Sequence, residues 1–406
     1  MTKKILYIIA SIAMASCSAT KNGTDAAAVP NSSEPVAAGS ITVKGEYATE
    51  KNGAFWGELL SEACTQSTSE NICLSPLSAQ LAMAMVANGA EGETKEEIYN
   101  AMQLGSDANA HSRELLDNLD NKSCEIKIAN SIWVNKKLNV KQEFIDTNKE
   151  NFDALVERIQ FNNKALKRIN DWCKENTNGK IESIIERLNK NDRMILLNAL
   201  YFKAAWDEPF QKKKTTDQKF TTVKGDEIMV PMMMMRKNAS FYKDDVLAMT
   251  AKRFKGGYNM LLVLPNEGVK CEEAAKYLAD DFDNILKNMS LCDLTLSMPK
   301  FTTNFDTSLK PMLANLGVER AFNGSAQFGG ISDEPLFISD VVQKTYINVD
   351  EEGAEAAAVT GVMVGLLSMK AQKIEILTLD RPFIYAIINN NNEVLFAGKV
   401  GNPATK

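Results

Sequence analysis

The chain has 406 residues, of which 45% are hydrophobic and 24% are charged, so it has ample apolar material for a globular core. Its formal net charge is −6, which argues against a nucleic-acid partner because the protein lacks the cationic excess that neutralises phosphates. By length alone the chain could hold two or three domains.

The N-terminal residues have the pattern of a targeting segment. Lys3 and Lys4 precede an apolar run, residues 5–15, that is too short to span a membrane comfortably. Small residues then precede Cys17, and residues 1–17 together resemble a bacterial lipoprotein signal. The resemblance implies that residues 1–16 are removed and that Cys17 carries a lipid anchor. The protein would then sit on the periplasmic face or the surface of a bacterial envelope, or reach the extracellular space; a plain secretory signal is the alternative.

Residues 17–44 comprise this cysteine and a stretch rich in Ala, Ser, Asn, Pro and Gly, which predicts a flexible tether. The folded part is expected to occupy residues 45–406. Of the seven cysteines, six follow Cys17, and none of these belongs to a Cys-x-x-Cys pair. Their spacing matches neither a metal knuckle nor a dense disulfide framework. We expect buried free thiols at Cys64, Cys73, Cys124, Cys173, Cys271 and Cys292.

The first half of the folded part mixes helical and strand patterns. Residues 71–74 have the pattern of a short strand leading into a helix, since Ser75 is a suitable cap and Pro76 suits the first turn. Asn198 is polar inside an apolar strand and so needs a partner. Periodicity predicts other helices over residues 46–64, 94–102, 109–123, 141–151 and 162–177, and strands over residues 126–134 and 194–202.

In the second half, residues 270–288 and 308–316 are predicted helices, and residues 258–265 and 294–300 are predicted strands. The methionines at 232–235 predict a strand packed in the core, with a methionine metal site as the alternative. Two apolar strands close the chain, residues 383–388 and 394–400, joined by a turn of asparagines.

Residues 341–349 alternate as a half-buried strand does, and the side chains of one face are Val341, Gln343, Thr345, Ile347 and Val349. An unusual segment follows. For about fifteen residues after Glu355 it is small, flexible and nearly uncharged, unlike a core strand or an ordinary linker. Its first part holds Glu351, Gly353, Ala354, Glu355, Ala356, Ala357, Ala358 and Thr360. A surface loop or a short alanine helix is the plain interpretation.

This segment resembles the hinge and reactive-centre loop of the serpins, with the loop covering residues 351–372. Other stretches resemble serpins too: the strand and helix at 71–78, the strands at 194–202 and 294–300, and the C-terminal strand at 394–400. The resemblance extends over residues 46–403. It implies an α+β fold, a single domain with three β-sheets and eight to nine helices, plus an exposed reactive-centre loop.

The resemblance also implies a serine protease inhibitor that acts as a suicide substrate. After cleavage the loop would enter a sheet as a new strand, with Ala354, Ala356, Ala358 and Thr360 facing the core together because alternate residues share a face. Counting fourteen residues from Gly353, as in the family, places the reactive bond between Leu367 and Ser368. Residues 366, 369 and 370 are neighbouring alternatives.

An apolar Leu367 suits chymotrypsin-like or cathepsin G-like proteases or other apolar-preferring serine proteases, and some cysteine proteases. The inhibitor would be a monomer that holds its target protease in a covalent complex. Carried over residue by residue, Lys300 and Glu351 match a salt bridge at the breach, where the loop enters the sheet, and Trp206 matches the tryptophan beside it. A weak surface ion pair is the alternative for this charge pair.

A second set matches the shutter, the polar cluster in mid-sheet where the strands part: Ser78, Asn198 and Gln343. Serpins commonly have a histidine where this chain has Gln343, but an amide can both donate and accept. Residues 109–123 are mostly acidic where heparin-regulated serpins are basic, so no polyanion cofactor is indicated.

Catalytic motifs are absent from the sequence. The only histidine, His111, lies in a polar predicted helix, and no Gly-x-Ser-x-Gly elbow, His-Glu-x-x-His motif, phosphate loop or dinucleotide fingerprint occurs. We therefore expect no enzyme activity, cofactor or metal, and a surface position for His111. Two rival functions stay open: a non-inhibitory serpin acting as a carrier or chaperone, and a lipoprotein ligand-binding module.

Overall fold

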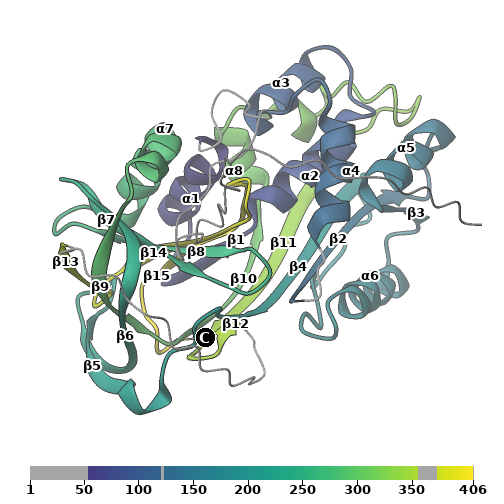
Figure 1. The fold of residues 1–406 in the computed structure, drawn as a ribbon. Coiled ribbons are helices and arrows are strands. Elements are labelled where there is room, and N and C mark those ends of the chain that lie inside the picture. The colour runs from purple at the N-terminus through teal and green to yellow at the C-terminus, as the bar shows by residue number, and fades with distance from the viewer. Residues whose placement is uncertain (1–53, 120–122, 355–372, 406) are drawn as a thin grey trace, which may run out of the picture. The chain divides into compact units, whose positions relative to one another are not determined.

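A computed structural model describes residues 54–119, 123–354 and 373–405, and Figure 1 shows their arrangement in eight α-helices and two β-sheets. Cys17, the tether and the segment from Glu355 to residue 372, with Leu367 and Ser368, lie outside the described residues. Within the described ranges no helix is long and apolar enough to cross a membrane.

The helices match the sequence pattern closely. Ser75 caps α2, its side chain accepting a hydrogen bond from the Ser78 backbone N–H, and Pro76 occupies the first turn, as predicted. The helices are α1 (Ala54–Gln66), α2 (Pro76–Ala87), α3 (Gly92–Met102), α4 (Ala108–Leu119), α5 (Gln142–Phe152), α6 (Asn163–Asn176), α7 (Cys271–Lys287) and α8 (Lys310–Asn315), with 3₁₀ turns η1 (Lys212–Lys214) and η2 (Arg320–Phe322).

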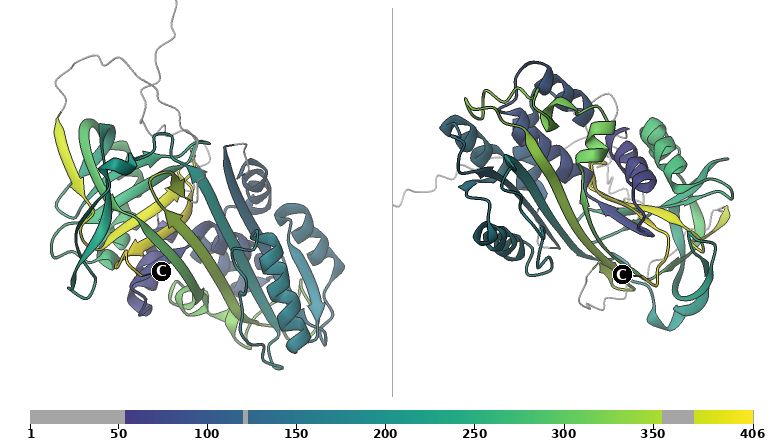
Figure 2. Two further views of the ribbon diagram at one scale, coloured as in Figure 1. Left: turned by 90° about the horizontal axis from the view of Figure 1, so that it is seen from below. Right: turned by 180° about the vertical axis from the view of Figure 1, so that it is seen from behind.

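The six-stranded sheet carries the candidate site, and its strand order is β10-β11-β12-β4-β2-β3. These strands are β10 (Phe301–Ser308), β11 (Ile338–Val349), β12 (Gly353–Ala354), β4 (Met194–Ala205), β2 (Cys124–Asn135) and β3 (Leu155–Ile159). Strands β4 and β11 pair in parallel from Met194 and Ile338 to Tyr201 and Tyr346. Beyond that point the two-residue β12 lies between them, antiparallel to both. Figure 2 shows β4 and β11 side by side from two further directions.

The second sheet has nine strands, where the sequence led us to expect two separate smaller sheets. The difference arises from β6, a 17-residue strand that pairs in turn with β5, β9 and β7 and so makes the two continuous. The strands are β1 (Asn71–Leu74), β5 (Thr216–Thr221), β6 (Glu227–Lys243), β7 (Leu247–Arg253), β8 (Asn259–Pro265), β9 (Ser290–Pro299), β13 (Ile374–Thr378), β14 (Phe383–Ile388) and β15 (Val394–Val400). Strands β3, β5, β7, β10 and β13 were not predicted.

Strand β11 divides its side chains as its alternating pattern predicts. The five residues assigned to one face, from Val341 to Val349, are all buried, and each residue between them is partly exposed. Their face belongs to the main core together with α2 and the nine-stranded sheet. The opposite face of β2 and β4 packs under α6 in a second core cluster that includes Trp133, Ile169 and Leu197. The part of the six-stranded sheet made by β2 and β4 is therefore covered on both faces, whereas the outward face of β10 is partly exposed.

Five of the predicted free thiols are buried, and Cys64 is partly exposed. Burial raises the pKa of Cys73 to about 11, so this thiol stays protonated and unreactive at neutral pH.

Candidate functional site

Trp206 and Phe210, just after β4, hold the start of the unusual segment through its backbone. The Trp206 backbone N–H donates to the Glu352 carbonyl at 2.8 Å, and its indole Nε1–H donates to the Asp350 carbonyl at 2.9 Å. The Phe210 N–H donates to the Glu351 carbonyl at 2.9 Å. We call this set of three bonds the hinge anchor. Sequence reasoning singled out Trp206 but not Phe210, which contributes only its backbone and buried ring.

Glu351 also forms an ion pair with Lys300 through its side chain, as the resemblance to serpins predicted. Its Oε2 lies 2.7 Å from Lys300 Nζ, and the Thr215 hydroxyl donates to Oε1 at 2.8 Å. The Glu351 side chain is 4% exposed, so this is a buried carboxylate rather than a surface one. Burial raises its pKa, but the Lys300 ammonium and the Thr215 hydroxyl outweigh burial, so the pKa lies below its usual value.

Gly353 and Ala354 already occupy the sheet as β12, whereas the sequence placed all of residues 351–372 in an exposed loop. Gly353 has φ of +153°, and a Cβ there would lie 2.2 Å from the Ala204 carbonyl oxygen, so only glycine fits. Ala354 is fully buried and pairs with Val349 on β11 and Ala204 on β4. These two residues are held by their own ladder pairings and follow directly after the residues that the hinge anchor binds.

In mid-sheet, Gln343 binds the start of α2 and not the two side chains with which the sequence grouped it. Its Oε1 accepts from the Ser75 N–H at 2.8 Å and its Nε2 donates to the Ser75 carbonyl at 2.9 Å. Asn198 stands beside Gln343 in the parallel register, but its Nδ2 donates to Asn130 Oδ1 on β2 at 2.7 Å. The predicted single cluster is therefore two separate amide contacts.

Several polar atoms here have no hydrogen-bond partner within the described part of the chain. They are Ser78 Oγ, Asn130 Nδ2 and Asn198 Oδ1. Burying such atoms unpaired is unfavourable, so the region where β4 and β11 meet is weaker than the apolar sheet around it. Sequence reasoning missed Ser75 and Asn130 in this role, although Ser75 was recognised as the helix cap.

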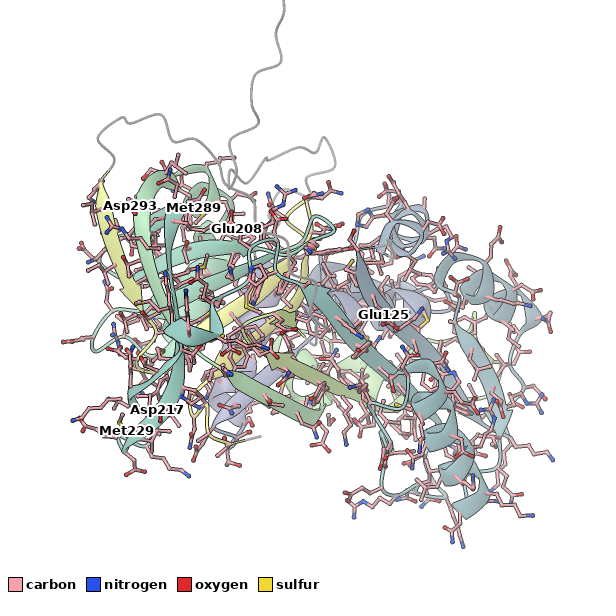
Figure 3. The ribbon with its side chains drawn as sticks, turned by 60° about the horizontal axis from the view of Figure 1, so that its bottom comes forward. Glu125, Glu208, Asp217, Met229, Met289 and Asp293 are labelled. Carbon is pink, nitrogen blue, oxygen red and sulfur yellow. The ribbon has the colours of Figure 1, made fainter. Side chains whose placement is uncertain are left out.

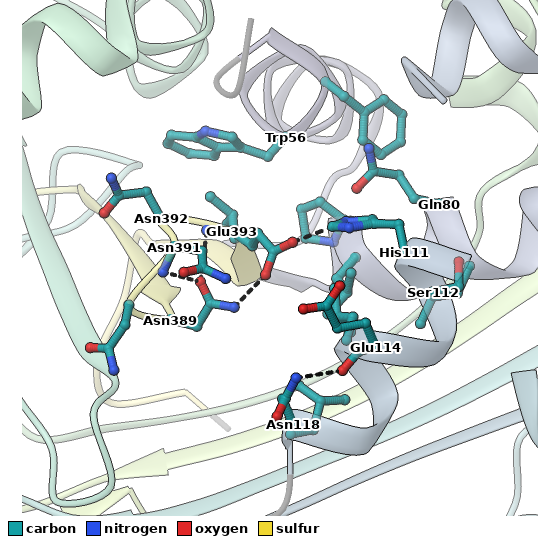
Figure 4. A pocket seen from close by; sticks show the side chains of 18 of the residues that line it. Trp56, Gln80, His111, Ser112, Glu114, Asn118, Asn389, Asn391, Asn392 and Glu393 are labelled. Carbon is teal, nitrogen blue, oxygen red and sulfur yellow. Dashed lines mark hydrogen bonds and ion pairs between the residues drawn. The ribbon is translucent and has the colours of Figure 1, made fainter. Parts of the chain in front are cut away.

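A cavity of about 740 Å³ lies apart from the hinge, among α1, α2, α4, the end of α7 and the β14–β15 turn (Figure 4). His111 lines it, with Nε2 3.1 Å from Glu393 Oε1, and this carboxylate raises the His111 pKa. Trp56 and Asn392 also line it; each is 3% exposed, and their Nε1 and Oδ1 atoms have no partner among the described residues. The described residues hold no group of three His, Cys, Asp or Glu side chains that could bind a metal.

Comparison with known proteins adds sequence and fold relatives. The family model described as "Serpin (serine protease inhibitor)" matches residues 50–403. A serine protease inhibitor of Cyanea capillata is 31% identical, covering 82% of this chain and 93% of its own. Human alpha-1-antichymotrypsin is 30% identical and covers 87% of each chain.

Among solved structures, native tengpin, a thermophilic serpin, matches with a TM-score of 0.81 and 30% identity over 89% of this chain and 96% of its own. Human thyroxine-binding globulin in complex with thyroxine matches with a TM-score of 0.79 and 26% identity, over 88% and 98% of the respective chains.

Proposed function

Since the chain belongs to the serpin family, we propose that it inhibits a serine protease by trapping it covalently while the loop inserts into the six-stranded sheet. The observation that carries the proposal is β12. Gly353 and Ala354 lie between β4 and β11 in a position that later residues of the loop could extend into a full strand. Within the residues described, β4 and β11 are the strands between which the segment that follows β11 has already entered.

In the proposed reaction the protease serine attacks the Leu367 carbonyl. The Leu367–Ser368 amide breaks, the new amino group of Ser368 leaves, and an ester joins the protease to Leu367. Residues 355–367 then enter between β4 and β11. Roughly thirteen residues at ~3.3 Å each would carry the protease about 40 Å along the sheet. Hydrolysis of the ester stalls when the pull on the serine displaces it from its oxyanion donors.

Insertion is favourable because one ladder of hydrogen bonds between strands is replaced by two. The parallel pairing of β4 with β11 is lost, and the new strand pairs antiparallel with both, as β12 already does. The inward side of β12 is fully buried at Ala354. By alternation Ala356, Ala358 and Thr360 would meet the same face, and their small volumes fit a packed core.

The target class follows from Leu367. An apolar side chain at the reactive bond suits chymotrypsin-like and cathepsin G-like proteases, and the likeness to human alpha-1-antichymotrypsin supports this choice. We further propose a monomer that is exported and anchored through a lipid on Cys17, with residues 17–44 as the tether and residues 45–406 as the inhibitory domain.

The test is a denaturing gel after mixing with chymotrypsin. A band with the summed mass of the protease and the cleaved chain is expected, together with a released peptide that begins at Ser368. Chymotrypsin with a sulfonylated serine is the control and should give no such band. Leu367→Arg should transfer complex formation from chymotrypsin to trypsin. Complete cleavage without a complex band would contradict the inhibitory mechanism.

The cavity favours a second candidate function, that of a ligand carrier. A volume of about 740 Å³ is that of a small-molecule site, and it contains one buried unpaired donor, Trp56 Nε1, and one buried unpaired acceptor, Asn392 Oδ1. A solved relative, thyroxine-binding globulin, is bound to thyroxine. Among the described lining residues, one lysine, Lys287, and one histidine, His111, stand against four carboxylates, Asp107, Glu114, Asp283 and Glu393, so a cationic or neutral ligand fits better than an anion.

Calorimetry with a matched naphthyl series tests the carrier function. Cationic propranolol should bind more tightly than its uncharged glyceryl ether analogue, and anionic naphthoxyacetate should bind least. Trp56→Phe removes the indole donor but keeps an aromatic ring, and it should weaken binding of all three. An absence of binding by every probe would count against the carrier function and leave the inhibitor untouched.

A further inference from the structure

A lysine is buried against the hinge anchor, in a strand where the core requires apolar side chains. Lys252 on β7 is 2% exposed. Its Nζ donates to the Glu208 carbonyl at 2.8 Å and lies 3.2 Å from Met235 Sδ. Glu208, labelled in Figure 3, lies in the loop that follows β4. Within the described residues these two neutral acceptors are its hydrogen-bond partners.

The same ammonium lies over the rings of Trp206 and Phe210, the two residues whose N–H groups form the hinge anchor. Its distance is 4.8 Å to the Trp206 ring and 4.4 Å to the Phe210 ring. Trp206 is itself stacked on Phe254, with ring centroids 4.1 Å apart. Any movement of the anchor rings that releases residues 350–352 therefore changes the surroundings of the amine.

Within the described residues no carboxylate pairs directly with the Lys252 ammonium, although two act on it from a distance. Lys237 on β6 repels it, while Glu208 and Asp207 attract it from the loop after β4. The Glu208 carboxylate is already paired with Lys237 at 3.0 Å. The two carboxylates of the hinge are paired as well, Glu351 with Lys300 and Glu352 with Lys212.

We propose that Lys252 is a positioning residue for loop insertion: acting through Trp206 and Phe210, its buried amine makes the hinge anchor easier to release when it carries a proton. The inference rests on the proposed inhibitory function, because insertion is the step it controls. Attraction between an ammonium and ring faces favours the closed anchor, the state in which the three hinge-anchor bonds are formed. Removal of the charge from water opposes that state, and no carboxylate among the described residues touches the amine to offset the loss.

The direction of the pH effect follows from proton linkage. Burial first, and the Lys237 ammonium second, lower the Lys252 pKa to about 7 in the closed anchor. In any state where water reaches the amine its pKa returns toward the ordinary value near 10.5. Between about pH 10.5 and pH 7 the released state carries the proton and the closed anchor does not, so release becomes more favourable as the pH falls. Below about pH 7 both states carry the proton, and the pH has no further effect.

The experiment follows opening of the sheet without any protease. A fluorescein-labelled peptide of residues 355–367 is mixed with the full chain, and its rate of binding between β4 and β11 is measured from about pH 6 to pH 9.5. For the parent we expect the rate at pH 7 to exceed that at pH 9 by on the order of tenfold, with a plateau below pH 7.

Three variants separate charge from packing. Lys252→Met keeps a long side chain without a titratable group, and its rate should stay slow and independent of pH. Lys252→Arg stays charged throughout and should be fast at both ends of the range. Arg253→Met removes an exposed cation one residue along the same strand and should keep the parental profile.

The outcomes distinguish this inference from the proposed function. A parental pH profile retained in Lys252→Met, or a flat profile in the parent, overturns the role of Lys252 even if chymotrypsin is trapped. A second outcome is that the pH profile of binding is lost in Lys252→Met while the parent forms no covalent complex with chymotrypsin. This result supports the role of Lys252 in opening the sheet and refutes the proposed inhibitory function. Urea unfolding at each pH checks that the variants are folded during the measurement.

Discussion

Glu351 Oε2 lies 2.7 Å from Lys300 Nζ, with the carboxylate 4% exposed and the lysine side chain 37% exposed. The pair joins the end of β11 to the residue between β9 and β10, and the Thr215 hydroxyl completes it. A buried carboxylate that loses its cation is costly, by up to about 3–5 kcal/mol for a fully buried pair. The partial exposure of Lys300 reduces this figure, since water screens the pair from that side.

Lys300→Met should therefore destabilise the hinge by about 1–2 kcal/mol and speed spontaneous loop insertion. The Glu351 pKa lies below its usual value, so the pair's stabilisation is present above that usual value and is lost as the pH falls through the lowered pKa. Thermal unfolding of parent and variant between about pH 3 and pH 7 measures this. The difference between the two proteins should shrink in acid; a constant difference would show that the ion pair is not its source.

Gly353→Ala should expel β12 from the sheet, because the new Cβ would lie 2.2 Å from the Ala204 carbonyl oxygen at a φ of +153°. Without β12 the loop would start insertion later, and cleavage would outpace trapping. We expect most of the variant to be cut by chymotrypsin and released. Gly324→Ala is the control, since a Cβ at Gly324 meets nothing within 4 Å. Equal complex formation by both variants would show that β12 is not needed.

Ala354→Arg tests insertion one residue further on. Ala354 is fully buried between β4 and β11, so an arginine there must displace β12 or bury an unpaired charge. A cost of at least ~1–3 kcal/mol slows insertion by about tenfold or more. The variant should be cleaved yet form little complex on a denaturing gel. Glu355→Arg changes a residue that alternation places on the other face, and it should trap chymotrypsin nearly as well as the parent.

Cleavage itself should stabilise the protein. An inserted strand adds hydrogen-bonded pairs on both sides, as β12 already does, whereas nicking an ordinary protein removes constraints. Calorimetry before and after cleavage between residues 361 and 370 should show a sharp rise in Tm. An unchanged or lower Tm would indicate a protein that does not insert its loop.

Cys17→Ala should move the protein from the membrane fraction to the soluble fraction, because it removes the thiol that would carry the proposed lipid. Detergent phase partitioning of the parent and the variant measures the change. Ser18→Ala, next to the proposed lipidation site, leaves the acceptor thiol in place and should stay with the membrane. Continued membrane association of Cys17→Ala would contradict the lipoprotein interpretation.

The sequence by itself determined the features that depend on neighbours along the chain. The alternation from Val341 to Val349 predicted the buried face of β11, and Ser75 with Pro76 predicted the start of α2. The same local patterns, together with the hinge residues, were enough for the resemblance to serpins. Period and capping are short-range physical constraints, so they can be read without knowing how the chain folds back on itself.

Only the tertiary structure decided which partners the key side chains meet. Gln343 binds Ser75, a residue 268 positions earlier, although Asn198 is its neighbour in the sheet. Lys252 sits in a strand whose sequence does not show whether its side chain faces water or the rings of Trp206 and Phe210. Likewise, the hinge pattern does not show that Gly353 and Ala354 are already inside the sheet. These contacts depend on how strands far apart in the chain align, and register across such distances is set by the packing of the whole core.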